Sequence, residues 1–456
     1  MNFDTIMFSK RKPLAKARWD GLFTLDHLQG GTIRQKLEED KLAWEKGTSL
    51  KSTEKKIRDL IRHAVNTTEF YKDFDPETDL SELPVVNKDT FRQNYDRFCS
   101  SKYLNDPKNR EMSTSGSTGT PFTIIQDQRK ARYNTADGIF LGMLANYWVG
   151  DRMAFFRVWV KNVRMSKKQM FIQNSLMIDS SDLSDDALKR ITDYLIDKKV
   201  ECIVGYSSAF GVLIDYLMRT GVDASRFSVK SIIPISEAMP DPVRKDLLTY
   251  FKCPVQAWYS NEENGIMGVQ YRDSDAYYIN SESYYYEILK MDSDEPAEDG
   301  ELGRIVITDL GNYAFPMIRY ENGDTAVAKH QYKDGRFRLT LTELYGRRSD
   351  LIFDTKGNAV TPYVITNNLW NAPGIRQFQF IQKGRKDYDL HLNGDRDVMD
   401  LDDILGRIKP SFGEDANIKV TFVDEIPVLA SGKRKYICNE SKDLSEEQKR
   451  VAGKVY

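Results

Sequence analysis

Helical and extended hydrophobic patterns alternate through the middle of the chain. Residues 184–199 are typical of a helix because Ser184 is a good N-cap and acidic residues follow it in the first turn. Similar signals predict a second helix that begins after Ser208 and stops at Gly221. They also predict a third helix over residues 240–251, with proline in its first turn. The apolar runs between these helices have the length of buried strands, at residues 202–204, 231–235 and 255–258. The alternation predicts β-α-β units and therefore a parallel sheet covered by helices on both faces.

The pattern differs on either side of this region. Residues 51–66 place apolar side chains at helical spacing, which predicts an amphipathic helix with a charged outer face. From about residue 276 the chain has strands joined by hairpin turns, which predicts a smaller mixed β region. Turn residues recur after Asp350 and indicate a separate α+β unit. We therefore expect an α/β fold with a large N-terminal domain, residues 1–350, and a small α+β C-terminal domain, residues 351–456.

Composition narrows the classes of partner. The 456 residues include 66 Lys and Arg against 68 Asp and Glu, so the formal net charge is -2 and nucleic acid is not an expected partner. No apolar run reaches the roughly 18 to 20 residues of a membrane-spanning helix, so we expect no membrane span. The four cysteines form no C-x-x-C pair, which argues against a disulfide framework or a structural zinc site and favours a cytoplasmic protein.

A stretch rich in hydroxyl side chains and glycine precedes Phe122. Small residues let backbone amides wrap phosphate oxygens, and hydroxyls donate further hydrogen bonds, so the stretch is a candidate phosphate loop. A flexible Ser/Gly linker is the alternative explanation. The stretch lacks the Gly-Lys-Ser/Thr ending of a Walker loop, which argues against that class of ATPase. The candidate phosphate-binding residues are Thr114, Ser115, Gly116, Ser117, Thr118, Gly119 and Thr120.

The expected parallel strands end at residues that could bind a ligand. Gly205-Tyr206, Ser236-Glu237 and residues 259–263 follow three successive strands. Because ligands bind beyond the carboxyl ends of parallel strands, these segments should share one crevice. Two of them carry carboxylates, which an apolar sheet edge would not hold without a partner such as a cation.

Several further motifs follow the candidate phosphate loop in a fixed order. Taken singly, Arg319, Asp324 or Arg347 could belong to a surface ion pair, and a basic run near Lys433 could be a turn. Taken together, the sequence resembles the adenylate-forming superfamily of acyl-activating ligases, and within it the phenylacetate-CoA ligase and capsular-polysaccharide branch. The matching elements are residues 115–121, Tyr259 with Glu263, and residues 300–303, 316–324, 346–350 and 431–433.

This resemblance implies a role for each matching position. It implies Lys433, on a mobile C-terminal domain, and Glu263 as catalytic residues. Asp350 would be the hinge between the domains. ATP and Mg²⁺ are the implied cofactors, with Glu263 and the neighbouring Glu262 as candidate metal ligands. The nucleotide-binding residues would be Ser236, Glu237, Tyr259, Asp324 and Arg347.

The sequence departs from the family pattern at three positions. Ser260 replaces the glycine that follows the family's tyrosine, and Glu262 stands where a hydroxyl residue is usual, so Glu262 and Glu263 could exchange roles. Phe122 occupies the position of a lysine that many relatives carry after the loop. This substitution leaves Lys433 as the principal candidate cation at the α-phosphate.

The implied reaction is ATP-dependent activation of a carboxylic acid as acyl-AMP with release of pyrophosphate, followed by acyl transfer. Two other functions stay open: a nucleotidyltransferase that passes AMP to a hydroxyl, and a non-catalytic nucleotide-binding protein of a polysaccharide pathway. Tyr206, Phe210, Trp258 and Tyr259 lie near the expected pocket and suit an aromatic acid. The sequence leaves open whether the acceptor is CoA, a carrier protein or a sugar, and whether the chain forms a homodimer.

Overall fold

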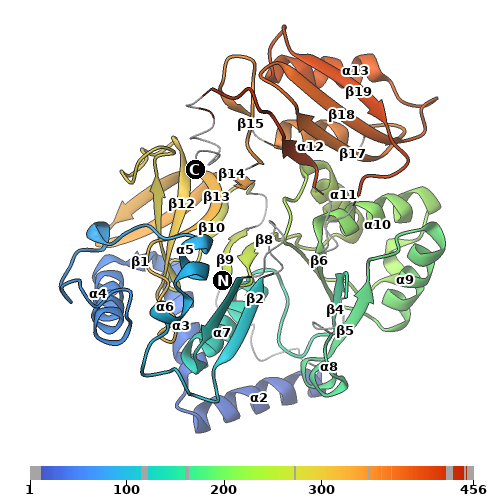
Figure 1. Ribbon diagram of the computed structural model, residues 1–456. Helices are drawn as coiled ribbons and strands as arrows, with labels where there is room; N and C mark the ends of the chain where they lie inside the picture. Colours follow the sequence, from blue (N-terminus) through green and yellow to red (C-terminus); the bar gives the residue numbers. More distant parts are fainter. Residues whose placement is uncertain are drawn as a thin grey trace.

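The parallel sheet predicted from the central alternation is confirmed in the computed structural model (Figure 1). Strands β4 (Met153–Arg157), β5 (Ser175–Asp179), β6 (Cys202–Tyr206), β7 (Ser231–Ile235) and β8 (Trp258–Asn261) run parallel in the order β8-β7-β6-β4-β5. The structure describes residues 12–114, 122–159, 164–271, 274–347, 350–360, 362–370, 372–427, 435–445 and 448.

The helices between these strands begin and end where local signals predicted. Helix α9 (Asp185–Asp197) is capped by the Ser184 side chain, which accepts a hydrogen bond from the Ala187 amide. Helix α10 (Ser207–Thr220) ends at Gly221, whose φ of 65° is the left-handed conformation that glycine adopts without strain. Helix α11 (Asp241–Phe251) follows Pro240. The last strand begins at Trp258, later than predicted, because Val255 forms only an isolated bridge with Ile232.

The later β region is a continuation of the same sheet and not a separate one. Strand β9 (Gly265–Gln270) turns back antiparallel on β8, and the sheet then continues through the remaining strands. Hydrogen bonding across these strands gives one twelve-stranded sheet. The added strands, in chain order, are β1 (Thr48–Ser49), β10 (Tyr277–Ile279), β11 (Tyr284–Leu289), β12 (Leu302–Asp309), β13 (Tyr320–Lys333) and β14 (Arg336–Arg347).

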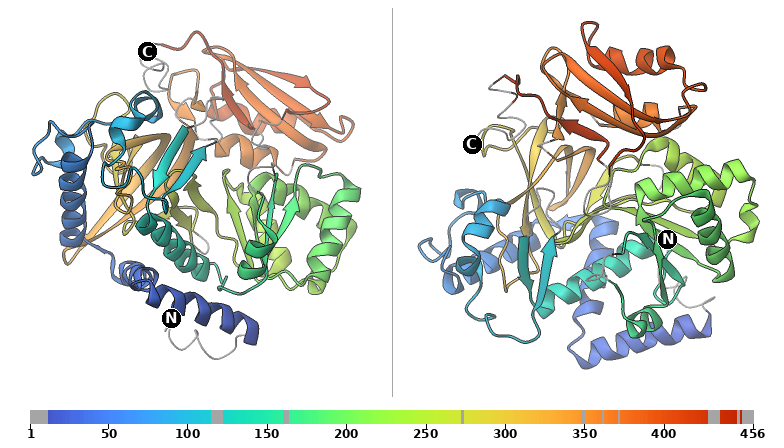
Figure 2. Two further views of the ribbon diagram at one scale, coloured as in Figure 1. Left: turned by 60° about the horizontal axis from the view of Figure 1, so that its bottom comes forward. Right: turned by 45° about the vertical axis from the view of Figure 1, so that its right-hand side comes forward.

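Helices at the start of the chain cover one side of this sheet (Figure 2). Helix α4 (Leu50–Thr67) is the predicted amphipathic helix, whereas α2 (Pro13–Leu28) and α3 (Thr32–Lys46) were not predicted. A hairpin of β2 (Arg110–Thr114) and β3 (Phe122–Gln126) lies beside them. The other helices are α5 (Lys88–Gln93), α6 (Tyr95–Phe98), α7 (Gln128–Leu144) and α8 (Lys167–Gln173). Within the described residues, no helix combines the length and the apolarity needed to span a bilayer.

The residues after Asp350 form their own small α+β unit around a separate core. Four strands pair in the order β19-β18-β17-β20, and this unit lies above α10 and α11 in Figure 1. Its elements are β15 (Ile352–Phe353), β16 (Ala359–Val360), α12 (Tyr363–Leu369), β17 (Ile375–Gln382), β18 (Asp387–Gly394), α13 (Leu401–Ile408), β19 (Asn417–Phe422) and β20 (Ile437–Asn439). The predicted boundary at residue 350 stays a prediction.

Candidate active site

Three of the predicted nucleotide-binding residues, on strands β8, β13 and β14, lie close together. Tyr259 on β8 donates a hydrogen bond from Oη to Asp324 Oδ2 at 2.8 Å. Arg347 is the cross-strand partner of Asp324, and its Nε lies 3.4 Å from Asp324 Oδ1. Asn322, two residues before Asp324, donates from Nδ2 to Tyr259 Oη at 2.7 Å. The fold therefore joins β8, β13 and β14 in one polar network, which we call the Tyr259–Asp324 network.

Burial and the neighbouring carboxylate of Asp324 set the charge states of Tyr259 and Arg347. Burial is the main reason why the pKa of Tyr259 lies well above its ordinary value, and the nearby carboxylate of Asp324 adds to the effect. Tyr259 is therefore a neutral donor at physiological pH. The carboxylate of Asp324 raises the pKa of Arg347, so its guanidinium stays charged although the side chain is partly buried. The network presents a charged guanidinium, a carboxyl group and oriented hydroxyl and amide groups.

Glu263 is buried beside this network and is held by three groups. Tyr320 Oη donates to Glu263 Oε1 at 2.7 Å, and Lys88 Nζ lies 3.0 Å from the same oxygen. Gln126 Nε2 donates to the backbone carbonyl of Glu263 at 3.0 Å. A buried carboxylate needs such a cation and hydrogen bonds to remain ionised. Glu262, in contrast, is exposed.

The residues at Glu263 fit a magnesium ion that is shared with a phosphate. Mg²⁺ in nucleotide sites takes one or two carboxylates and completes its shell with substrate oxygens and water. Within the described residues, the side-chain contacts of the Glu263 carboxylate with Tyr320 and Lys88 are both at Oε1. The described part of the chain contains no group of three or more His, Cys, Asp or Glu side chains that could hold a metal without such help.

The end of β7 is tied to the start of α10. Ser236 has a φ of 71°, a left-handed conformation that is uncommon for a residue other than glycine and is often found at functional sites. Glu237 Oε2 accepts a hydrogen bond from the Ser208 amide at 2.9 Å, and Ser207 Oγ donates to the Glu237 carbonyl at 3.1 Å. These contacts hold the β7 loop over the strand ends.

Other predicted site residues fall outside the described residues or at their edge. Thr114 is the last residue of β2 and pairs with Phe122, and the rest of the candidate phosphate loop, residues 115–120, lies outside the described residues. Lys433 also lies outside them. Asp350, the predicted hinge, forms an ion pair with Lys435, whose Nζ lies 2.6 Å from Asp350 Oδ1. The assignments of the loop and of Lys433 stay predictions.

The structure adds one residue that sequence reasoning missed, Lys88. No local sequence motif marks Lys88, because its contact with Glu263 depends on how helix α5 packs against a distant part of the chain. Phe91, one turn further along α5, stacks on Phe122 with ring centroids 5.7 Å apart, and Phe122 directly follows the candidate phosphate loop. Arg319, which belongs to a predicted motif, instead pairs with Glu287 at 3.0 Å and donates to the Leu83 carbonyl. Lys88 therefore joins the site, whereas the contacts of Arg319 are with Glu287 and with the chain at Leu83.

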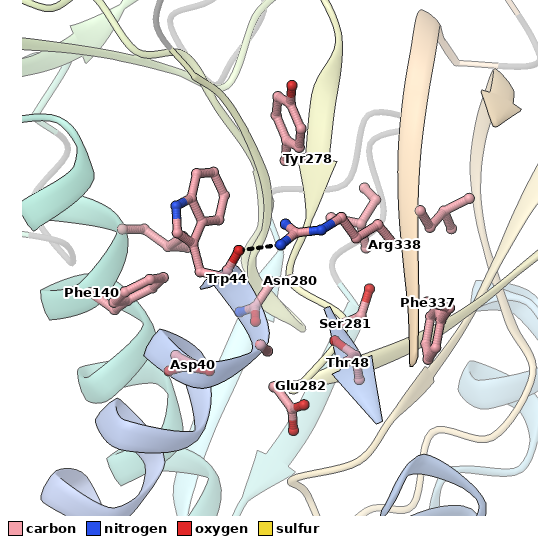
Figure 3. Close-up of a pocket in the computed structure, with 14 residues that line it drawn as sticks. Asp40, Trp44, Thr48, Phe140, Tyr278, Asn280, Ser281, Glu282, Phe337 and Arg338 are labelled. Carbon is pink, nitrogen blue, oxygen red and sulfur yellow. Dashed lines mark hydrogen bonds between the residues drawn. The ribbon is translucent and has the colours of Figure 1, made fainter. Parts of the chain in front are cut away.

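A separate cavity of about 50 Å³ lies between the N-terminal helices and the sheet (Figure 3). Trp44 and Phe140 come from helices, and Phe337 and Arg338 from β14. Arg338 donates to the backbone carbonyl of Trp44, as the dashed line in Figure 3 marks. The cavity shares no lining residue with the Tyr259–Asp324 network, so it is not the crevice predicted at the strand ends.

Comparison with known proteins finds similarity to CapK and to phenylacetate-CoA ligases. A family model described as the CapK C-terminal domain matches residues 352–440. Protein CapK of Staphylococcus aureus is 23% identical over 423 residues, which cover 85% of this chain and 88% of that protein. These matches support a relationship to the CapK and phenylacetate-CoA ligase branch of the adenylate-forming superfamily. The phenylacetate-coenzyme A ligase of Pseudomonas putida is 20% identical over 354 residues, 71% of this chain and 72% of the relative.

Solved structures show the same fold. A crystal structure of 2-hydroxyisobutyryl-CoA ligase in the post-adenylation state superposes with a TM-score of 0.68 at 16% identity, covering 88% of this chain and 91% of that chain. The same ligase in the thioesterification state gives a TM-score of 0.54, with 86% and 90% covered. The anthranilate CoA ligase AuaEII gives 0.51 at 14% identity over 71% of this chain and 66% of that chain.

Proposed function

We propose that this chain activates a carboxylic acid as an acyl-adenylate at the expense of ATP. The observation that carries the proposal is the Tyr259–Asp324 network with Glu263 beside it. Four groups suited to a nucleotide and its phosphates converge from distant parts of the chain: a phenol, two carboxylates and a guanidinium. The similarity to phenylacetate-CoA ligases supports the same class of reaction.

In this reaction a carboxylate oxygen of the acid attacks the α-phosphorus of ATP. A bond forms between that oxygen and phosphorus, the bond from phosphorus to the bridging oxygen breaks, and pyrophosphate leaves with the electron pair. Both reactants are anions, so the barrier falls when fixed positive groups and amide dipoles offset the charge that accumulates at phosphorus. The proposed groups are the amides of residues 116–120 and the ammonium of Lys433.

The remaining residues hold the nucleotide during this step. Asp324 accepts hydrogen bonds from ribose hydroxyls, Arg347 stays charged beside it, and Tyr259 packs near adenine. Magnesium, held by Glu263 when bound, would neutralise phosphate charge. Lys88 Nζ lies 3.0 Å from Glu263 Oε1 and would add a positive charge to the site. The acyl group then passes from the adenylate to an acceptor, for which the ligase relatives favour CoA.

A rotation of the C-terminal domain about Asp350 would separate the two half-reactions. It would remove Lys433 after adenylation and open a path for the acceptor. The higher TM-score with the post-adenylation state than with the thioesterification state supports an arrangement nearer to the first half-reaction.

The test is acid-dependent release of pyrophosphate, measured with a panel of carboxylic acids in the presence and absence of CoA. Lys433→Ala should abolish ATP–pyrophosphate exchange but spare acyl transfer from a preformed acyl-adenylate. Lys419→Ala removes an exposed lysine from the same domain and serves as the control. Unaltered exchange in Lys433→Ala would overturn the role of that lysine.

Mass analysis of the products separates this function from the alternatives. An acyl-adenylate or acyl thioester supports the ligase. AMP covalently attached to a hydroxyl acceptor would indicate a nucleotidyltransferase. Nucleotide binding without pyrophosphate release, across the whole acid panel, would indicate a non-catalytic protein.

A further inference from the structure

Arg157 lies at the ligand-binding edge of the parallel sheet. It is the last residue of β4, and β4 lies between β5 and β6. Residues Phe156 and Gly205 pair across β4 and β6, so Arg157 is level with Tyr206 at the end of β6. In parallel sheets ligands bind beyond the carboxyl ends of the strands, and the β7 and β8 loops lie at this same edge. Arg157 is therefore in a position to contact a ligand in that crevice.

Two aromatic rings hold the guanidinium of Arg157. Its carbon Cζ lies 5.5 Å from the centre of the Trp159 ring and 5.9 Å from that of Tyr206. Trp159 is itself fixed, because its Nε1 donates to the Ile178 carbonyl at 3.1 Å. Tyr206 is 3% exposed. Rings on two sides restrict the side chain, and a cation–π contact does not by itself cancel a full charge.

Arg157 has no carboxylate partner among the described residues. Its Nε is buried and makes no hydrogen bond, and no ion pair found in the described part of the chain includes it. Asp179 is its register partner on β5, but Asp179 is exposed and accepts from the Ser181 amide instead. A buried N–H without an acceptor costs about 1–3 kcal/mol, more when the group is charged. An anionic ligand would remove this cost.

We propose that Arg157 binds a second anionic group of the acyl substrate, so that the substrate is an acid with a carboxylate or phosphate besides the reacting carboxylate. This inference rests on the proposed function. Two of the aromatic residues that were expected to line an aromatic pocket, Tyr206 and Phe210, belong instead to the buried core. They therefore do not argue against an anionic group in the substrate. The proposed acid-binding site would therefore differ from a purely apolar pocket by one oriented cation, Arg157.

The strand order bounds the shape of this substrate. The nucleotide-binding Tyr259 is on β8, and the order β8-β7-β6-β4 places three strand spacings between it and Arg157. At about 4.8 Å per spacing the backbones are about 14 Å apart, and the long arginine side chain shortens the gap. The two anionic groups should therefore be separated by several bonds, as across an aromatic ring or a medium-length carbon chain.

The experiment compares acids that differ only in the second anionic group. Pyrophosphate release is measured with phenylacetate, 4-carboxyphenylacetate and 4-(phosphonooxy)phenylacetate, and with hexanoate and adipate. Wild-type protein should prefer the doubly anionic member of a pair by about a hundredfold in kcat/KM. Arg157→Gln should reduce that preference at least tenfold through KM for the acid, with KM for ATP unchanged. The better of the carboxylate and phosphate probes identifies the second group.

Two controls make each outcome decisive. Arg190→Gln removes an exposed arginine from the neighbouring α9 and should change neither preference nor KM. Arg157→Lys keeps the charge, so it should retain part of the preference if Arg157→Gln folds poorly. Pyrophosphate release that favours the simple acids, or a preference that survives Arg157→Gln, overturns the role of Arg157 and leaves the proposed function intact. Absence of release with every acid overturns the proposed function, and this inference with it.

Discussion

The indole of Trp370, in the C-terminal unit, packs against the backbone of helix α10 at Gly211. A Cβ atom at position 211 would come within 2.6 Å of the indole Nε1. A second contact lies nearby, where Asn367 Nδ2 donates to Asp241 Oδ2 at 2.9 Å. Gly211 is therefore required by close approach of the ring and not by an unusual backbone angle. This contact holds the C-terminal unit over α10 and α11.

Gly211→Ala should weaken this arrangement. The added methyl overlaps the ring, and such overpacking costs about 1–3 kcal/mol. We expect pyrophosphate release to slow by about tenfold, while acyl transfer from a preformed adenylate is retained. Trypsin cleavage near the hinge should become faster in the variant.

The matched control is Gly406→Ala in helix α13, where an added Cβ meets nothing within 4 Å. It should behave like wild type. Equal rates of both half-reactions in Gly211→Ala and wild type would contradict a role for this contact in catalysis.

Lys88 and Glu263 should act as one unit. Lys88→Gln leaves the buried carboxylate without its cation, and Glu263→Gln removes the charge that Lys88 neutralises. Each single variant should lower kcat/KM for ATP by about ten- to a hundredfold, which is ~1.4–2.7 kcal/mol. The double variant should lose much less than the product of the two effects. A double-mutant cycle measures the coupling, and strictly additive losses would argue against a functional pair.

Tyr259→Phe should weaken nucleotide binding. It removes the hydroxyl that donates to Asp324 and accepts from Asn322, and leaves both without that partner. Hydrogen bonds to charged groups contribute about 1.5–3 kcal/mol, so the Kd for AMP should rise at least tenfold in calorimetric titrations. Tyr285→Phe, on β11, is the control. An unchanged Kd in Tyr259→Phe would place the nucleotide elsewhere.

The pH dependence of stability should contain a contribution from His63. Its Nε2 lies 2.8 Å from the Tyr313 carbonyl, and burial lowers the pKa of the imidazole below its usual 6.5. The folded protein therefore holds His63 neutral while the unfolded chain protonates it, so stability falls as pH drops below about 6.5. In thermal unfolding experiments, Tm should decrease between pH 7.5 and 5.5, and this decrease should be smaller in His63→Gln than in wild type.

Glutamine can still donate to the Tyr313 carbonyl, which keeps the local hydrogen bond. His27→Gln, at an exposed position, should leave the pH profile of Tm unchanged. A profile for His63→Gln that superimposes on that of wild type would show that other groups cause the acid destabilisation.

Local signals were sufficient for much of the N-terminal domain. The Ser184 cap, the left-handed Gly221 and the buried run in β6 each depend on neighbouring residues, so the sequence predicted α9, α10 and β6 within a few positions. Helix α2 was missed because its N-cap, Lys12, makes no side-chain capping bond. The continuity of the sheet was missed because pairing of β9 with β8 is a contact between strands that no local pattern specifies.

The sequence by itself determined the alternation of helices and strands in the central sheet and the order of the candidate motifs, because periodicity, caps and motif spacing are written in adjacent residues. Only the tertiary structure decided which of these residues meet. It brought Lys88 to Glu263, separated buried Glu263 from exposed Glu262, and left Arg157 between two rings without a described carboxylate partner. The physical reason is that charge neutralisation and burial depend on distances between segments far apart in the chain, which are fixed by packing.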